Sequence, residues 1–421
     1  MRVWGSISSA DTSSDSQRAS TTFSCTVSLF GTVILFSVFV EISVLYLKII
    51  YFTAVQEMIQ RTDPMAIITH VGTANPDFFL SQKDASAIMT QHYRDELSRR
   101  GLSVLQQVLE HPAIEKRHMS VTDHGELLTL KNEDPDARMT RFTRWAVGLG
   151  KKAIETALEK AGKNKTHIGA IVCNTCTGYV CPGISTYIAE ALELPPTIPL
   201  FDLVGSGCGG ALPNIDLAKR LLSDCADDQV VISLSVEICS ATFEMSNDMS
   251  LIISNGIFGD GAAAAVLSRE GAGFRLGKIY SRYLPQHREK VRFTYKKGRL
   301  HNRLDPKLPH IIAQELPPLI EDVLAGTDTT PSDIPYWAVH PGGDKVLTEV
   351  RNSLGLEETH MDISRQVLRE YGNMSSPSVL FELDRILSQE PACGDECLMT
   401  AFGAGLSAFA VKGVYTTAYR G

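Results

Sequence analysis

Three polar side chains in this sequence stand where the chain is expected to turn sharply: Cys208, His340 and Asn373. Cys208 is flanked by glycines and precedes a segment, 211–222, that predicts a helix. The first turn of a helix carries unpaired N–H groups and the positive end of the helix dipole. Such surroundings lower the pKa of a cysteine and favour the nucleophilic thiolate. Cys208 is therefore a candidate nucleophile, although a glycine-rich turn also suits a small buried cysteine.

His340 and Asn373 add chemistry that a nucleophilic cysteine needs. His340 ends an apolar run, Trp337-Ala-Val, and is followed by Pro-Gly-Gly, which predicts a strand end and a turn. Asn373 follows Gly372 and opens a predicted helix, so on its own it is explained as an N-cap. Taken together, an imidazolium stabilises a thiolate, and His and Asn donors hold a developing enolate oxygen. The set predicts acyl transfer through a cysteine.

Composition narrows the class of protein. The 421 residues are 44% hydrophobic and 21% charged, which is an ordinary globular balance. A formal net charge of −8, without long Lys/Arg runs, argues against nucleic-acid binding. The nine cysteines are irregularly spaced, which predicts a reducing, cytoplasmic compartment. The pairs Cys173/Cys176 and Cys393/Cys397 are too far apart for a zinc ribbon, so we expect no metal. No nicotinamide or flavin motif is present, and no cofactor is expected.

The N-terminal residues 1–57 form a predicted region of their own. Residues 1–24 are rich in Ser and Thr and predict disorder. Residues 25–55 are apolar, interrupted by Glu41 and Lys48, and are long enough to cross a bilayer. A Glu inside the span is unfavourable. Two interpretations stay open: a membrane anchor that associates the enzyme with the bilayer, or a leader outside the working enzyme.

The remaining chain alternates predicted strands and helices. Ala66–Val71 and Ile168–Cys173 predict strands, and Ser81–Arg99 and Arg138–Ala161 predict helices. A hairpin is expected within 274–304, with its turn at Lys296-Lys-Gly298. The alternation favours an α/β fold around a largely parallel, buried sheet.

Two pairs of similar motifs within the sequence suggest a duplication. Phe258-Gly-Asp-Gly-Ala-Ala-Ala264 and Phe402-Gly-Ala-Gly-Leu-Ser-Ala408 both read FGxGxxA before a strand. The glycine turns at 207–208 and 372–373 each precede a helix. We therefore expect two related halves, 58–273 with the cysteine and 274–421 with the histidine and asparagine.

At these motifs the sequence resembles a known family. Val204-Gly-Ser-Gly-Cys-Gly-Gly210, Ile257-Phe-Gly-Asp-Gly-Ala262, Trp337-Ala-Val-His-Pro-Gly-Gly343 and Tyr371-Gly-Asn-Met-Ser-Ser376 are similar to motifs of the type III polyketide synthases. These are the chalcone and stilbene synthase-like enzymes of the thiolase fold. The resemblance covers about Met58 to the C-terminus. It implies duplicated βαβ halves layered α/β/α/β/α, a homodimer, and no cofactor beyond its acyl-CoA and malonyl-CoA substrates.

The resemblance also implies residue roles. Cys208 would carry the starter acyl group and the growing chain, and His340 and Asn373 would promote decarboxylation of malonyl-CoA and hold the enolate. His340 would also pair with the Cys208 thiolate. Positions matching the family's substrate-binding groups are Phe258, Cys176, Thr177, Cys181, Gly403 and Gly405. Phe258 matches the gatekeeping Phe between the CoA tunnel and the reaction cavity. The loop Ala401-Phe-Gly-Ala-Gly405 departs from the family's GFGPG.

Where this sequence differs from the plant members of the family, the differences affect which starter acyl-CoA the enzyme would accept. Cys181, before Pro182, matches a residue that reaches into the partner's cavity, where plant relatives carry a larger Met. The region Leu300–Leu304 lacks the plants' second gatekeeping Phe. The stretch 176–183 is similar to microbial alkylresorcinol and alkylpyrone synthases. We therefore expect a roomy pocket that prefers medium- to long-chain fatty acyl-CoA, with a chalcone-like product as the other option. The Cys181-Pro182 bond is a candidate for cis.

Three other interpretations are less consistent with the residues. A ketoacyl-ACP synthase III-like condensing enzyme shares the fold and a Cys-His-Asn set, but lacks the His-Pro-Gly-Gly form. An α/β-hydrolase has its acidic residue before its His, whereas Asn373 follows His340. A non-catalytic, membrane-tethered thiolase-like scaffold would not need all three polar residues.

Overall fold

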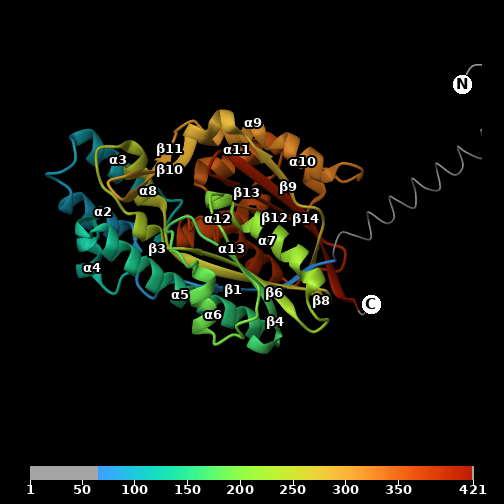
Figure 1. Cartoon of the computed structure of the whole chain (residues 1–421). Helices are drawn as coiled ribbons and strands as arrows, with labels where there is room; N and C mark the ends of the chain where they lie inside the picture. The colour runs from blue at the N-terminus through green and yellow to red at the C-terminus, as the bar shows by residue number, and fades with distance from the viewer. Residues whose placement is uncertain (1–64, 420–421) are drawn as a thin grey trace, which may run out of the picture. The chain divides into compact units, whose positions relative to one another are not determined.

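The computed structural model describes residues 65–419, which belong to a compact unit beginning at residue 64 (Figure 1). The predicted leader and apolar segment, 1–57, lie outside the described residues. Among residues 65–419, none of the helices combines the length and the apolarity needed to span a bilayer.

Ten strands form one mixed sheet. Its order is β5-β4-β6-β7-β1-β8-β14-β13-β12, and β9 pairs with β14. Two smaller sheets are the hairpin β10–β11 and the pair β2–β3. The strands are β1 (Ile67–Ala74), β2 (Phe79–Ser81), β3 (Lys116–His118), β4 (Ile168–Asn174), β5 (Leu200–Leu203), β6 (Val230–Glu237), β7 (Gly261–Ser268), β8 (Gly271–Leu276), β9 (Tyr280–Tyr283), β10 (Val291–Lys296), β11 (Arg299–Leu304), β12 (Tyr336–Val339), β13 (Glu396–Gly403) and β14 (Ser407–Tyr419).

The expectation of a largely parallel sheet is wrong. Only β4–β5, β4–β6 and β12–β13 pair in parallel, whereas β1, β7, β8 and β14 pair antiparallel with their neighbours. The turn between β13 and β14, Ala404–Leu406, is three residues long. A connection this short joins only antiparallel strands, because parallel strands need a long crossover. The hairpin predicted at Lys296–Gly298 is present as β10–β11.

Helices cover the strands in layers. One core cluster packs α5 and α6 against β4, β6 and β7, and another packs α9, α10 and α11 against β12, β13 and β14. Helices α7 and α13 contact strands of both groups and lie between them (Figure 1). The helices are α2 (Gln82–His92), α3 (Arg99–Leu109), α4 (His124–Thr129), α5 (Pro135–Lys160), α6 (Ile184–Ala191), α7 (Ala211–Leu221), α8 (Met249–Ile257), α9 (Leu308–Glu315), α10 (Pro317–Leu324), α11 (Asp344–Leu354), α12 (Asp362–Tyr371) and α13 (Ser378–Leu387). This is the layered α/β/α/β/α architecture expected of the thiolase-like fold.

Local sequence signals explain where helices begin and end. Asp134 caps α5 by accepting a hydrogen bond from the Ala137 N–H, and Pro135 occupies its first turn. The helix predicted over 81–99 ends earlier than expected, and the separate helix predicted over 102–109 begins earlier. α2 ends at His92, and Ser98 caps a new helix, α3, by accepting from the Gly101 N–H at 3.1 Å. A Ser that accepts a hydrogen bond from a backbone N–H fixes the start of a helix, whereas the spacing of apolar residues does not mark this boundary.

The strand order is mirrored about the β1–β8 contact. On one side the order runs β1, β7, β6, β4, and on the other β8, β14, β13, β12. On the first side β4 and β6 are parallel, and β6 and β7 are antiparallel. On the second side β12 and β13 are parallel, and β13 and β14 are antiparallel. The mirrored order supports a duplication, while the boundary between halves at 273/274 stays a prediction.

Candidate active site

Cys208 sits in a 3₁₀ turn, Gly207–Gly209, between β5 and α7. Gly207 has φ +56°, and a Cβ there would lie 2.8 Å from the Ala404 nitrogen. The turn therefore needs glycine, both for its backbone conformation and for its close approach to the β13–β14 turn. The Ala404 N–H donates to the Ser206 carbonyl at 3.2 Å, which joins the two turns.

His340 and Asn373 are held by the backbone of neighbouring elements. His340 follows β12, is 3% exposed, and donates its N–H to the Thr400 carbonyl on β13 at 2.9 Å. Asn373 follows α12 and exchanges backbone hydrogen bonds with the segment that carries Phe258. Its Oδ1 accepts from the Ser375 N–H at 2.7 Å, so the amide NH₂ is turned toward the Gly342 carbonyl, 3.4 Å away.

These three residues come together around one cavity. A chamber of about 50 Å³ is lined by Cys208, His340 and Asn373, together with Phe258 and Gly403. The three side chains come from separate parts of the chain. The structure thus assembles the predicted set beside a space in which a reacting carbonyl would sit.

A second, inner chamber of about 30 Å³ also opens on Cys208, and Cys176, Thr177 and Phe258 line it. Of the other predicted residues, Cys181 is exposed and lines neither chamber, and its bond to Pro182 is cis. Gly405 also lines neither, although its N–H donates to the Val291 carbonyl at 3.1 Å.

The roomy pocket predicted from the small Cys181 and the missing Phe stays a prediction, because Cys181 lines neither chamber of the single chain. The two chambers together are far smaller than pockets for drug-sized ligands, which are about 300–1,000 Å³. Phe293, on β10, lines the inner chamber, so an aromatic ring is supplied by a strand outside the region 300–304 in which it was sought.

Burial sets the protonation of the catalytic pair. It raises the pKa of Cys208 to about 12, and a 3.3 Å hydrogen bond from the Ser375 hydroxyl offsets this only in part. Burial also lowers the pKa of His340 to about 3. The predicted resting thiolate is therefore not favoured, because desolvation outweighs the dipole of a short 3₁₀ turn. At neutral pH the pair is thiol and neutral imidazole, and His340 Nδ1 has no hydrogen-bond partner among the described residues.

Sequence reasoning missed Glu237, a fully buried carboxylate at the end of β6. It accepts from the Thr177 and Ser376 hydroxyls at 2.8 and 2.7 Å, and from the Cys176 N–H at 2.9 Å. Its second oxygen is 3.3 Å from the Ser375 hydroxyl that contacts Cys208. Glu237 thus ties the loop after β4 to the loop that carries Asn373. An acidic residue closing an otherwise apolar strand was the available signal.

The buried neutral histidine predicts an acid-dependent loss of stability. Below pH 6.5 the unfolded chain binds a proton at His340 that the folded chain does not, so stability falls as the pH drops from 6.5 toward 3. We expect His340→Gln to remove about 2 kcal/mol of the loss between pH 7 and pH 5, at about 1.4 kcal/mol per pH unit. Urea unfolding of both proteins at the two pH values measures this. Equal losses would contradict the burial of a neutral imidazole.

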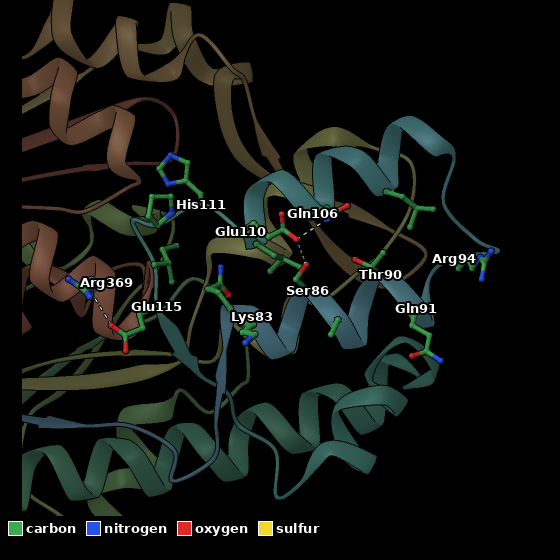
Figure 2. A pocket seen from close by; sticks show the side chains of 16 residues that line it. Lys83, Ser86, Thr90, Gln91, Arg94, Gln106, Glu110, His111, Glu115 and Arg369 are labelled. Atoms are coloured by element: carbon green, nitrogen blue, oxygen red, sulfur yellow. Dashed lines mark hydrogen bonds and ion pairs between the residues drawn. The ribbon is translucent and has the colours of Figure 1, made fainter.

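A larger cavity, about 1080 Å³, lies away from these residues. It is a groove between α2 and α3, bridged by hydrogen bonds from Ser86 and Gln106 to Glu110 and bordered by the Arg369–Glu115 pair (Figure 2). None of the predicted site residues lines it. The volume of a cavity therefore does not identify the candidate site in this protein. The chamber around Cys208 is identified by the three polar side chains that line it.

A third cavity adjoins the site. It has a volume of about 430 Å³, and Leu304, Gly342 and Val346 line both this cavity and the chamber around His340. Lys345 and His111 also line it, next to the N-terminus of α11. Asp305 and Asp344 line it as well, so its side chains are of mixed charge, and the backbone N–H groups at the start of α11 are the part that suits an anionic group. The cavity is therefore a candidate entrance for a phosphate-bearing substrate.

Comparison with known proteins gives consistent matches. Residues 54–271 match the family model of the chalcone and stilbene synthase N-terminal domain, and residues 276–413 match the C-terminal domain. A 3,5-dihydroxyphenylacetyl-CoA synthase from Amycolatopsis orientalis is 31% identical, over 70% of this chain and 84% of its own length. One of the same name from Streptomyces toyocaensis is 28% identical, over 78% and 84%.

Solved structures share the fold. A 1,3,6,8-tetrahydroxynaphthalene synthase from Streptomyces coelicolor, a bacterial type III polyketide synthase, has a TM-score of 0.77 and 23% identity. The C-terminal type III polyketide synthase domain of a type I/III hybrid from Dictyostelium has a TM-score of 0.77 and 21% identity. Each comparison covers 83% of this chain and 99% of the other.

Proposed function

Because the chain belongs to the chalcone and stilbene synthase family of type III polyketide synthases, we propose that Cys208, His340 and Asn373 carry its condensation chemistry. The protein is an acyltransferase that condenses malonyl-CoA. One observation carries the residue roles: three polar side chains, far apart in sequence, line one small cavity.

Loading begins with transfer of the starter. The neutral imidazole of His340 takes the proton of the Cys208 thiol as the sulfur attacks the thioester carbonyl of acyl-CoA. A carbon–sulfur bond forms to Cys208, the bond to CoA breaks, and the proton leaves with the CoA thiolate. Because the pKa of Cys208 is raised, the resting residue is a thiol and not a thiolate. The proton is therefore transferred to His340 as the sulfur attacks.

Extension follows when malonyl-CoA enters. Loss of CO₂ leaves an enolate whose oxygen accepts hydrogen bonds from the Asn373 amide and from His340. The enolate carbon attacks the acyl group on Cys208, a carbon–carbon bond forms, and the cysteine leaves and regains a proton. The lengthened chain is then on CoA and returns to Cys208 for the next round. Phe258 lines both chambers, which suits a gate between entrance and reaction space.

The substrates enter through the 430 Å³ cavity, with the CoA phosphates near Lys345 and the N-terminus of α11. Incubating the purified protein with malonyl-CoA and an acyl-CoA, and measuring free CoA and product by mass spectrometry, tests the function. CoA release with a polyketide product supports it. Absence of both would favour the non-catalytic scaffold instead.

The sequence predicted two classes of product, alkylpyrone or alkylresorcinol and chalcone-like. Relatives named 3,5-dihydroxyphenylacetyl-CoA synthase support a small resorcinol-type aromatic product. The eight cysteines of the described residues are all unpaired, which suits a reducing, cytoplasmic setting.

A homodimer is the expected assembly. β5 ends the sheet, and Tyr179, Phe201 and Val204 beside it are large apolar side chains with exposed fractions of 63%, 37% and 59%. An exposed edge with apolar side chains suits a second copy of the chain. The partner would cover these residues, and Cys181 would reach the partner's cavity.

We expect sedimentation to give a dimer for the wild type and a monomer for a Phe201→Asp, Val204→Asp double variant. A charge in an apolar interface is strongly unfavourable. Tyr295→Asp, at another exposed aromatic, is the matched control and should stay dimeric. A fully active wild-type monomer would refute the assembly.

A further inference from the structure

The hairpin β10–β11 forms one wall of the inner chamber. Phe293 pairs with Asn302 across the hairpin, and Val291 pairs with Leu304. Residues opposite each other, and residues two apart on one strand, point to the same face. All four side chains line the chamber next to Cys208. The hairpin therefore presents three apolar side chains and one amide to whatever Cys208 carries, and Arg292, whose guanidinium is paired with Glu289, also borders the chamber.

Asn302 is the unusual member of this face. It is only 9% exposed, and its side-chain amide makes no hydrogen bond with any other described residue. Its nitrogen and oxygen are not among the buried side-chain atoms that lack a hydrogen-bond partner, so the amide is open to the chamber and a ligand there can reach it. The Asn302 amide faces a chamber rather than a protein partner. A bound ligand with oxygen atoms would supply the missing hydrogen bonds, since the amide offers both a donor and an acceptor.

The chamber also limits the size of that ligand. Its volume is about 30 Å³, and Phe293 and Phe258 occupy its walls. These two rings narrow the space beside Cys208, which favours a short acyl group over a long one. Ser375 and Cys176 add polar atoms to the lining. A hydrocarbon tail would offer the Asn302 amide no hydrogen-bond partner.

We propose that Asn302 is a specificity-determining residue that hydrogen-bonds a carbonyl oxygen of a short, oxygen-rich acyl chain on Cys208, while Phe293 limits its length. The starter is then an acetyl or malonyl unit, rather than the fatty acyl group expected from the sequence. Each condensation adds a carbonyl group, so the growing chain keeps presenting oxygen atoms to the amide. This inference rests on the proposed function, with Cys208 as the acyl carrier.

The test compares starters and variants of the full chain. With malonyl-CoA as extender, we expect the wild type to use acetyl-CoA at least about tenfold better, in kcat/KM, than dodecanoyl-CoA. Asn302→Leu keeps the size but loses the hydrogen bond, and should lower kcat/KM for acetyl-CoA about tenfold. Asn302→Ser should recover part of this. Arg303→Gln, exposed on the same strand, is the matched control and should behave as wild type. Phe293→Ala should raise the use of dodecanoyl-CoA relative to acetyl-CoA.

Two results would overturn the inference. One is a wild type that prefers dodecanoyl-CoA, which needs no variant to fold. The other is a folded Asn302→Leu enzyme with the wild-type rate on acetyl-CoA. Decarboxylation of malonyl-CoA is followed in the same samples by the release of CO₂. This measurement distinguishes a failure of the proposed function from a failure of the role of Asn302 alone. If the wild type shows neither decarboxylation nor product, the proposed function fails. If it shows both but ignores Asn302, only the specificity role fails.

Discussion

A Cys208→Ala enzyme is expected to make no detectable polyketide while it still releases CO₂ from malonyl-CoA. Removing the sulfur removes the atom that carries the acyl chain, and loss of a covalent nucleophile lowers turnover by on the order of a thousandfold or more. His340 and Asn373, the residues proposed to promote decarboxylation, remain in place and line the same 50 Å³ chamber. Product by mass spectrometry and CO₂ release, measured on the same sample, separate the two steps.

The matched control is Cys225→Ala. Cys225 is a half-buried thiol that lines neither chamber, so its removal should leave both activities at the wild-type level. Polyketide formed by a Cys208→Ala enzyme would contradict the role of Cys208. If a folded Cys208→Ala enzyme made no product and also released no CO₂, the thiol would take part in decarboxylation as well.

An Asn373→Ala enzyme is expected to lose decarboxylation and condensation together, each by about two to three orders of magnitude. The amide donates to an oxygen that becomes charged only as CO₂ leaves, and removing one such donor has an effect of about this size. The backbone contacts of residue 373 with Ile257 and Gly259 do not involve the side chain, so the loop should persist. Single-turnover CO₂ release and product formation measure the two losses.

Asn352→Ala, at an exposed amide on α11, is the control and should be neutral. A variant at Asn373 that decarboxylates normally but fails to condense would assign the amide to positioning the acyl chain instead of the enolate.

Much of the site could be predicted from local sequence. Cys208 stands in a turn that requires glycine, and His340 ends a short apolar strand, so both positions are fixed by neighbours along the chain. Motifs of this kind survive in the sequence because a turn needs particular residues in a particular order. The layered fold followed from the resemblance to a known family, rather than from the strand pattern, which suggested too much parallel pairing.

What could not be predicted depends on contacts distant in sequence. The protonation of Cys208 and His340 is set by burial, which no local pattern reports. Glu237 is a site residue only because loops near 176 and 375 meet at the end of β6. Asn302 faces the chamber because of the hairpin register, in which a shift of one residue would turn it outward. Pocket size likewise depended on Phe293.

The most direct test of the central claim is mass spectrometry of the acylated protein. After brief incubation with acetyl-CoA, peptides of the wild type should show an acetyl group on the fragment that contains Cys208 and on no other cysteine. The adduct should disappear when malonyl-CoA is added, because condensation removes the chain from the sulfur. An adduct that forms on another residue, or that persists in Cys208→Ala, would contradict the account.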